Sequence, residues 1–348
     1  MPMVRATRML NAVKAGTISG EQLETLLTGD PARFSEFNVL SGLPGTMRSA
    51  ANSSASMVAV AASSTAMALI IASDTALLEF TGSAASMAVV AANQTVISTL
   101  IASTPSLAAM TASRAAMNAL AMSSDGMNIV AASSTARSAV LASSKAFNII
   151  ATKNMAMGKF IAGCAGLSPA DYATMEAITA SASTMSSVWA SNTATDAVMA
   201  SNIARLAVYN SDTALAQLQY KPLQVERLIT NNATLNINYG YGDITLITNG
   251  KKIIFLRRYY SSQEYDYINW TRGSTTVGDG NGLTAGEGGR TLYTAATARG
   301  CNSGTYTNDG VTPVTNNVTG NFVCAANGLR RHSAAYGNTT QYVYYIPV

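Results

Sequence analysis

A period of ten residues dominates the chain and constrains its fold more than any other feature. From about residue 51 to 160 one pattern returns, as in Ser63-Ser64-Thr65-Ala66-Met67 and Ser133-Ser134-Thr135-Ala136-Arg137. One column, from Ser53 to Lys153, holds Ser or Asn at ten of eleven positions, and both residues are favourable helix N-caps. The columns four and seven residues later are apolar at ten and at eleven of eleven positions. This spacing predicts a short helix with one apolar face.

Two features indicate that each repeat is a separate helix. A ten-residue period corresponds to about 3.3 residues per turn, so the apolar stripe of one continuous helix would drift around its surface. Pro105 follows Ser103 within the predicted first turn, where a missing N–H is harmless, whereas in a strand it would remove a ladder bond. We therefore expect a miniature α-solenoid of two-turn helices. The predicted core residues are Met67, Ile70, Leu77, Phe80, Met87, Val90, Met117 and Leu120.

A single repeat is too small to fold alone. Burying one Met and one Ile stabilises it by roughly 3–6 kcal/mol, whereas ordering ten residues costs roughly 15 kcal/mol. Each repeat therefore needs neighbours on both sides, and contacts between subunits would add to these. If the helices alternate in two layers about 10 Å apart, some fifteen of them would span roughly 70 Å.

Composition divides the chain near Lys221-Pro222. All 16 Met precede residue 200, and 12 of the 15 Tyr follow residue 220. Pro222 restricts the residue before it and predicts the end of a helix there. We expect an N-terminal helical segment over 1–42, the solenoid over 43–220 with a break near 161–180, and a β domain over 221–348. Capping signals place short N-terminal helices at about 4–15, 20–28 and 31–41, with a core of Leu23, Leu26, Leu27, Phe34, Phe37 and Leu40.

The C-terminal part has the alternation of antiparallel strands. Apolar residues alternate over 235–239, and Asn249-Gly250 separates two further alternating runs, which predicts a hairpin. We expect short strands at 290–297 and 318–325, and a last strand over Tyr342–Ile346. The predicted fold class is therefore α+β, with a helical cap, a solenoid of ten-residue repeats and an antiparallel β domain.

Two groups of residues in the predicted β domain are open to a functional interpretation. The densest aromatic cluster suits contact with carbohydrate or protein, although the same residues could form the core and the cross-strand pairs of a small domain. Its members are Tyr259, Tyr260, Tyr265, Tyr267 and Trp270. Cys301 and Cys324 are candidates for a disulfide, with two reduced thiols as the alternative.

Composition and spacing argue against several functional classes. Charged residues make up only 11% of the chain and the net charge is +4, without the basic stripe that is typical of nucleic-acid binding. Arg5 and Arg8 are followed by no apolar run, so we expect no secretion signal. Ser interrupts every apolar stretch before it reaches ~18 residues, so no membrane insertion is expected.

Catalytic and metal-binding patterns are weak. His332 is the one histidine, and no GxSxG motif accompanies it. Carboxylates such as Glu264 and Asp266 could pair as in a glycosidase, but many β domains contain such pairs by chance. One histidine and three separated cysteines do not make a zinc site, and Gly278–Gly282 lacks the ordered acidic ligands of a calcium loop. We expect no enzyme activity, no cofactor and no metal.

The opening segment Arg5–Leu10, the segment Gly16–Leu27 and the Ala-Ala-Ser-Ser-Thr-Ala-Met repeat at 61–67 together resemble a known family. They are similar to repeat-containing tail-fibre and virion structural proteins of tailed bacteriophages, over roughly residues 4–215. The resemblance implies a virion location after synthesis in the host cytoplasm. It also implies other virion proteins as partners, self-association as a homo-oligomer such as a trimer, and a C-terminal module that attaches to a host glycan or protein.

Three functions compete at this point. A virion fibre or appendage would assemble on a particle and turn over no substrate. A polysaccharide-degrading tailspike would show carboxylate-dependent cleavage. A bacterial surface adhesin with the same architecture would need a secretion signal, and the sequence does not suggest one.

Overall fold

The computed structural model of the chain describes residues 47–48, 51–52, 54–62, 64–239, 244–247, 251–260, 266–272, 275–278, 320–326, 329–333 and 340–348. These residues belong to two compact units, which divide between Thr174 and Met175. The division falls inside the break that the sequence predicts near 161–180. The three helices predicted before residue 42 and their core lie outside the described residues.

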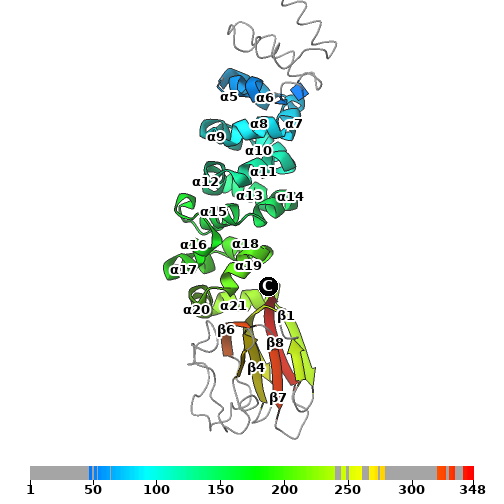
Figure 1. The fold of residues 1–348 in the computed structure, drawn as a ribbon, viewed down its shortest axis with the longest axis vertical. Helices are drawn as coiled ribbons and strands as arrows, with labels where there is room; N and C mark the ends of the chain where they lie inside the picture. The colour runs from blue at the N-terminus through cyan, green and yellow to red at the C-terminus, as the bar shows by residue number, and fades with distance from the viewer. Residues whose placement is uncertain are drawn as a thin grey trace, which may run out of the picture. The chain divides into compact units, whose positions relative to one another are not determined.

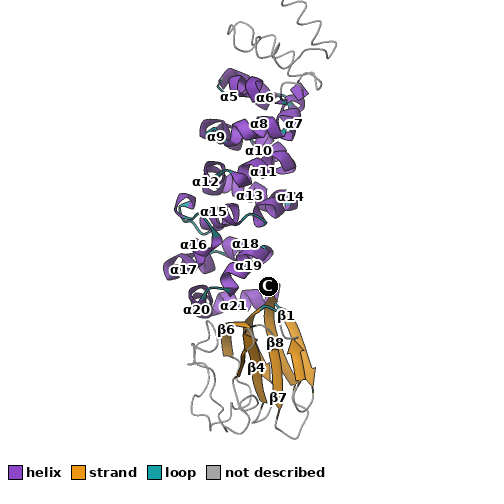
Figure 2. Ribbon diagram, in the orientation of Figure 1, coloured by secondary structure: helices purple, strands orange, loops and turns teal. Residues whose placement is uncertain are grey.

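The first unit contains a run of short helices (Figures 1 and 2). Nearly all are eight or nine residues long, as the ten-residue period predicts. They are α5 (Ser54–Ala61), α6 (Ser64–Ala72), α7 (Asp74–Gly82), α8 (Ala84–Ala91), α9 (Gln94–Ala102), α10 (Thr104–Ala112), α11 (Arg114–Met122), α12 (Ser124–Ala132), α13 (Ser134–Ala142), α14 (Ser144–Ala151) and α15 (Asn154–Cys164).

The serine column caps these helices as predicted. Ser73 has extended backbone angles (φ −116°, ψ 112°), and its hydroxyl accepts a hydrogen bond of 3.2 Å from the Ala76 N–H. This bond satisfies one of the donors that the first turn of a helix leaves without a partner. Pro105 lies in the first turn of α10, and there Ser103 makes no side-chain capping bond. The helical interpretation of the repeat is confirmed.

Successive turns of the solenoid contain three helices each. Each helix contacts the next one in the chain, and most also contact the third one along, as in the series α5, α8, α11 and α14 and the series α9, α12 and α15. The two alternating layers assumed for the estimate of roughly 70 Å therefore do not describe this unit. With turns about 10 Å apart, the eleven helices rise by only about 35 Å, because each helix advances the stack by a third of that spacing rather than by half.

The cap serines also link one turn to the next. In five of them the hydroxyl donates to a backbone carbonyl 32 residues earlier, at the end of the helix one turn before. The donor and acceptor pairs are Ser83 and Ala51, Ser113 and Thr81, Ser123 and Ala91, Ser143 and Thr111, and, in the second unit, Ser211 and Thr179. A single hydroxyl thus accepts within its own helix and donates to the preceding turn, which satisfies a carbonyl that its helix leaves without a partner.

The apolar columns fill the interior of the stack. All eight predicted core residues are buried, none more than 2% exposed. Arg137 is the one polar residue in the column four residues after the caps. Its guanidinium lies at the end of the preceding helix and donates a hydrogen bond of 2.6 Å to the Ala131 carbonyl. Arg205 has the same place in its own repeat, and it donates to the Met199 carbonyl, again six residues earlier. An arginine is therefore compatible with this column because its charged group caps a helix end.

The break after α15 depends on two close contacts with α12. Lys159 is only 3% exposed, and its amine donates to Asn128 Oδ1 (2.7 Å) and to the carbonyl of Pro169 (3.2 Å) in the 3₁₀ turn Pro169–Asp171. At Gly163, an added Cβ would lie 2.0 Å from the Ala131 carbonyl oxygen. The missing side chain thus allows α15 to approach the end of α12.

The second unit begins with six more helices. They are α16 (Met175–Thr179), α17 (Ala182–Ala190), α18 (Asn192–Ala200), α19 (Asn202–Tyr209), α20 (Asp212–Gln219) and α21 (Pro222–Asn231). Trp189 is buried among them, and its indole N–H donates to the Ala214 carbonyl (3.0 Å). A helix ends before Pro222 as predicted, since α20 stops at Gln219, but Pro222 also opens α21, where its missing N–H is harmless, so the helical part extends to Asn231 and not to residue 220.

Eight described strands follow, in two four-stranded antiparallel sheets (Figure 2). The strands are β1 (Thr234–Tyr239), β2 (Ile244–Ile247), β3 (Ile253–Tyr260), β4 (Asp266–Arg272), β5 (Thr275–Gly278), β6 (Gly320–Ala326), β7 (Leu329–Ser333) and β8 (Thr340–Pro347). Their order is β1-β8-β3-β6 in one sheet and β2-β7-β4-β5 in the other. The pairs β1–β8, β2–β7, β3–β6 and β4–β5 are nested, which is the strand order of an eight-stranded jelly roll.

This topology corrects one prediction and confirms two. The runs on either side of Asn249-Gly250 form β2 and β3, which lie in different sheets, so they do not pair as a hairpin. Consecutive strands of a jelly roll often pass from one sheet to the other, and this arrangement overrides the local turn signal. The strands expected near 318–325 and 342–346 are present as β6 and β8, whereas the one expected at 290–297 lies outside the described residues.

Candidate interaction surfaces

The five predicted recognition residues do not lie on one sheet. Tyr259 and Tyr260 belong to β3 in the first sheet, and Tyr267 and Trp270 belong to β4 in the second, while Tyr265 lies outside the described residues. Cys301, one half of the proposed disulfide, also lies outside the described residues, and Cys324 is in β6.

Strand pairing in the sheet β2-β7-β4-β5 brings together residues that are distant in sequence. Tyr267 pairs with His332, and Asn269 pairs with Arg330, which in turn pairs with Thr245 on β2. The register therefore aligns Thr245, Arg330, Asn269 and Gly278 across the four strands. The sequence does not show how these four strands are aligned, and their register is visible only in the structure.

The other sheet is buried on both faces at one end. Ile253, Ile254, Phe255 and Leu256 are consecutive in β3, and none is more than 1% exposed. Because neighbouring residues of a strand lie on opposite faces, both faces of β3 are covered there. Helix α20 contacts β6 of this sheet, and the amine of Lys252 lies 5.6 Å from the centre of the Tyr209 ring. This sheet therefore has a mainly structural role at that end.

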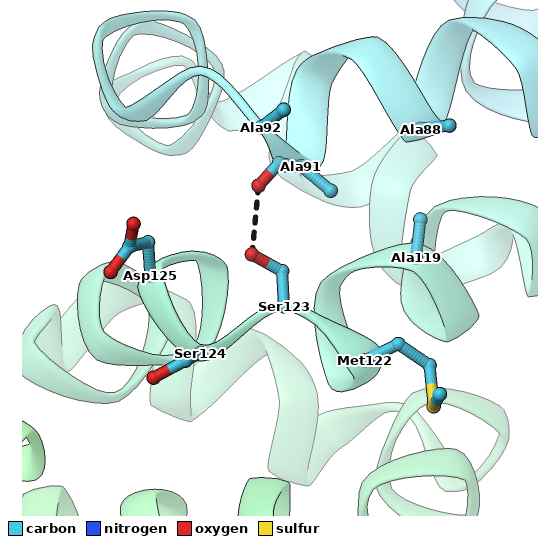
Figure 3. A pocket seen from close by; sticks show the side chains of 8 residues that line it. All are labelled: Ala88, Ala91, Ala92, Ala119, Met122, Ser123, Ser124 and Asp125. Atoms are coloured by element: carbon cyan, nitrogen blue, oxygen red, sulfur yellow. Dashed lines mark hydrogen bonds between the residues drawn. The ribbon is translucent and has the colours of Figure 1, made fainter.

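The solenoid of the first unit presents a surface with few charges. The exposed positions of α8 are Ala84 and Ala88, and the residue after the helix, Ala92, is exposed as well. Beside them lies a shallow hollow of about 510 Å³ between α8, α11 and α12, with the exposed side chain of Met122 at its edge (Figure 3). The Ser123–Ala91 hydrogen bond closes its floor. The hollow is open, alanines and serines form most of its lining, and Asp125 is the one ionisable residue among the lining residues.

Burial is the main cause of the shifted pKa values of two ionisable groups of the first unit. Burial lowers the pKa of the Lys159 amine, and the nearby carboxylates of Asp125 and Asp171 partly oppose this shift. Burial likewise raises the pKa of the Cys164 thiol to about 12. The hydrogen bonds of Lys159 hold the break segment to α12. Both are best explained by packing.

Within the described residues, no three His, Cys, Asp or Glu side chains are grouped as a metal site would require. No single helix among those residues has the length and apolar character needed to cross a membrane. Only α8 and α9 taken together meet that test, and the chain bends by 107° between them.

No protein-family model matches this sequence, and a search of curated proteins finds no significant relative. The interpretation of the chain therefore depends on its repeat, its two sheets and the segments quoted above for the phage resemblance.

Proposed function

We propose that the chain is a structural component of a tailed phage virion, a fibre or appendage whose helical repeats act as a spacer and whose C-terminal β domain attaches to a host surface or to another virion protein. The observation that carries the proposal is the combination of a hydrogen-bonded repeat solenoid with a jelly-roll domain in one chain.

The solenoid supports the role of a spacer. Its turns are joined by apolar columns and by serine hydroxyl bonds that recur at the same 32-residue separation. Solenoids of this kind set a distance through the number of their repeats. The weakly charged, alanine-rich exterior suits packing against other protein surfaces better than the capture of a charged solute.

The β domain supports the role of attachment. The jelly roll is a frequent scaffold of viral capsid and lectin domains, although a fold by itself does not specify a function. Strand β4 contributes residue types that suit recognition, including Tyr267, Asn269 and Trp270. The opening segments Arg5–Leu10 and Gly16–Leu27 support a virion protein through their resemblance to phage tail proteins.

Two measurements test the proposal. Purified particles of the phage that encodes the chain should contain it when analysed by mass spectrometry, and the purified chain should adsorb to host cells and reduce adsorption of the phage. Release of reducing ends from host polysaccharide would instead favour a depolymerase. Absence of the chain from particles would contradict the proposal.

A further inference from the structure

We propose that Lys159 and Asn128 react with each other to form a covalent amide cross-link between α15 and α12. The two helices lie one turn of the solenoid apart, and the Lys159 amine lies 2.7 Å from Asn128 Oδ1, across 31 residues of sequence. The inference concerns the cohesion of the first unit and does not depend on the proposed function.

The pair differs from two others with the same spacing. Residues 31 apart also meet as Arg48 with Glu79 and as Asp196 with Arg227, and both of these are ion pairs with an exposed partner, since the side chains of Arg48 and Asp196 are 67% and 51% exposed. Lys159 is only 3% exposed, and its partner here is an uncharged amide. A buried amine without a paired anion favours its neutral form, which is the nucleophilic form.

The geometry suits attack of the amine on the amide carbon of Asn128. Cγ lies one carbonyl bond, about 1.2 Å, beyond Oδ1, so the Lys159 nitrogen is within about 4 Å of Cγ. Reacting atoms in a near-attack arrangement are about 3–3.5 Å apart, and a small side-chain adjustment closes the difference. The Pro169 carbonyl accepts a second hydrogen bond from the amine (3.2 Å) and fixes its position. Burial lowers the pKa of this amine, which makes its neutral form available at a lower pH than in an ordinary lysine.

The proposed step exchanges one amide for another. The lone pair of the neutral Lys159 amine forms a bond to Asn128 Cγ, the Cγ–Nδ2 bond breaks, and Nδ2 leaves as ammonia after receiving one proton from the attacking nitrogen. Two nearby carboxylates can carry that proton. Asp125 is three residues before Asn128 and therefore on the same side of α12, and Asp171 ends the 3₁₀ turn that begins at Pro169.

The cross-link would fasten the last turn of the first unit. Hydrogen bonds and apolar packing alone hold α15 to α12 before the reaction, whereas a covalent bond would keep the two helices together under tension or heat. Until the bond forms, Lys159 keeps a free amine that titrates as described for burial. Chains prepared and stored at pH 6 are therefore the starting material for a test.

The test is the intact mass of the full chain after transfer from pH 6 to pH 9. One ammonia, about 17 Da, should be lost, and the loss should be faster at pH 9 than at pH 7 because more of the amine is neutral. After trypsin digestion, tandem mass spectrometry should find the peptide that contains Asn128 joined to an uncleaved peptide that contains Lys159. An unchanged mass, or a loss of ammonia without joined peptides, would overturn the inference.

Lys159→Arg keeps a cation but removes the nucleophilic amine, and Asn128→Ala removes the carbon that it attacks. Neither variant should lose ammonia, whereas Asn118→Ala, at the matching position of the preceding helix, should react as wild type does. Cyclisation at an Asn-Gly sequence such as Asn249-Gly250 also releases ammonia, so an equal loss in Lys159→Arg would identify that reaction and reject the cross-link. If the variants do not fold, wild type in urea replaces them. Joined peptides formed there would show that the folded geometry is not required, which contradicts the inference.

Discussion

The hydroxyl of Ser123 donates a hydrogen bond of 2.7 Å to the carbonyl oxygen of Ala91, 32 residues earlier, and accepts one of 3.0 Å from the Gly126 N–H. One atom therefore both caps α12 and joins it to the end of α8 in the preceding turn (Figure 3). The same double use recurs at Ser83, Ser113 and Ser143. The serine of each repeat thus contributes to the stacking of turns as well as to the start of a helix.

Replacing Ser123 by Ala should lower the free energy of unfolding by about 1–3 kcal/mol, since it removes a cap and leaves the Ala91 carbonyl without this donor. Ser103→Ala is the matched control, because Ser103 makes no side-chain capping bond; we expect a change within about 0.5 kcal/mol. Urea unfolding followed by circular dichroism measures both. Equal losses in the two variants would show that the inter-turn bond contributes nothing.

Gly163→Ala and Gly82→Ala should have opposite effects. A Cβ at position 163 would clash with the Ala131 carbonyl, whereas nothing lies within 4 Å of one at position 82. We expect the first variant to lose about 1–3 kcal/mol through overpacking, and the second to gain about 0.5–1 kcal/mol because Ala favours the helix. Thermal melts of the two proteins provide the comparison. A stabilised Gly163→Ala protein would rule out the close approach of α15 to α12.

The buried amine of Lys159 should make stability depend on pH in the alkaline range. Its pKa in the folded protein lies below the ordinary 10.5, so between the two values the unfolded chain binds more protons, and stability rises with pH through that window. The unfolding free energy of wild type minus that of Lys159→Met should therefore increase from neutral pH toward about 10.5. Lys159→Gln serves if the Met variant does not fold. A difference that stays constant with pH would refute this.

Cys164 should react slowly with alkylating agents in the native protein. With a pKa of about 12, about one thiol in ten thousand is ionised at pH 8, and the thiolate is the reactive form. Iodoacetamide labelling, followed peptide by peptide with mass spectrometry, should be faster in urea by at least two orders of magnitude. Similar rates in the two conditions would mean that the thiol is open to solvent.

The sequence predicted the helices of the solenoid well because their determinants are local. The cap at Ser73 and the apolar positions Leu77 and Phe80 lie within one repeat, so period and spacing suffice to place them. The number of helices per turn depends instead on contacts between residues 32 apart, such as Ser113 and Thr81, and one repeat carries no sign of that distance.

The boundary between the helical part and the β domain, and the topology of the sheets, also depend on contacts that the local sequence does not reveal. Pro222 follows the end of α20 and opens α21, and only the packing of Val225 and Leu228 in the buried columns shows that the helical part continues. Those two residues continue the ten-residue spacing from Leu215 and Leu218, a signal that could have extended the solenoid to Asn231. The partnership of Tyr267 with His332 depends on register between distant strands and had no local sign.

Three helices per turn make the solenoid a screw as well as a spacer. Adding or removing one ten-residue repeat would advance the stack by a third of its pitch and also rotate whatever follows by about a third of a revolution. Three repeats, which restore the original azimuth, correspond to ninety nucleotides of coding sequence. In-frame duplication of thirty-nucleotide units could therefore change both the length of the solenoid and the rotational orientation of whatever follows it. Only the addition of three units at a time would change the length alone.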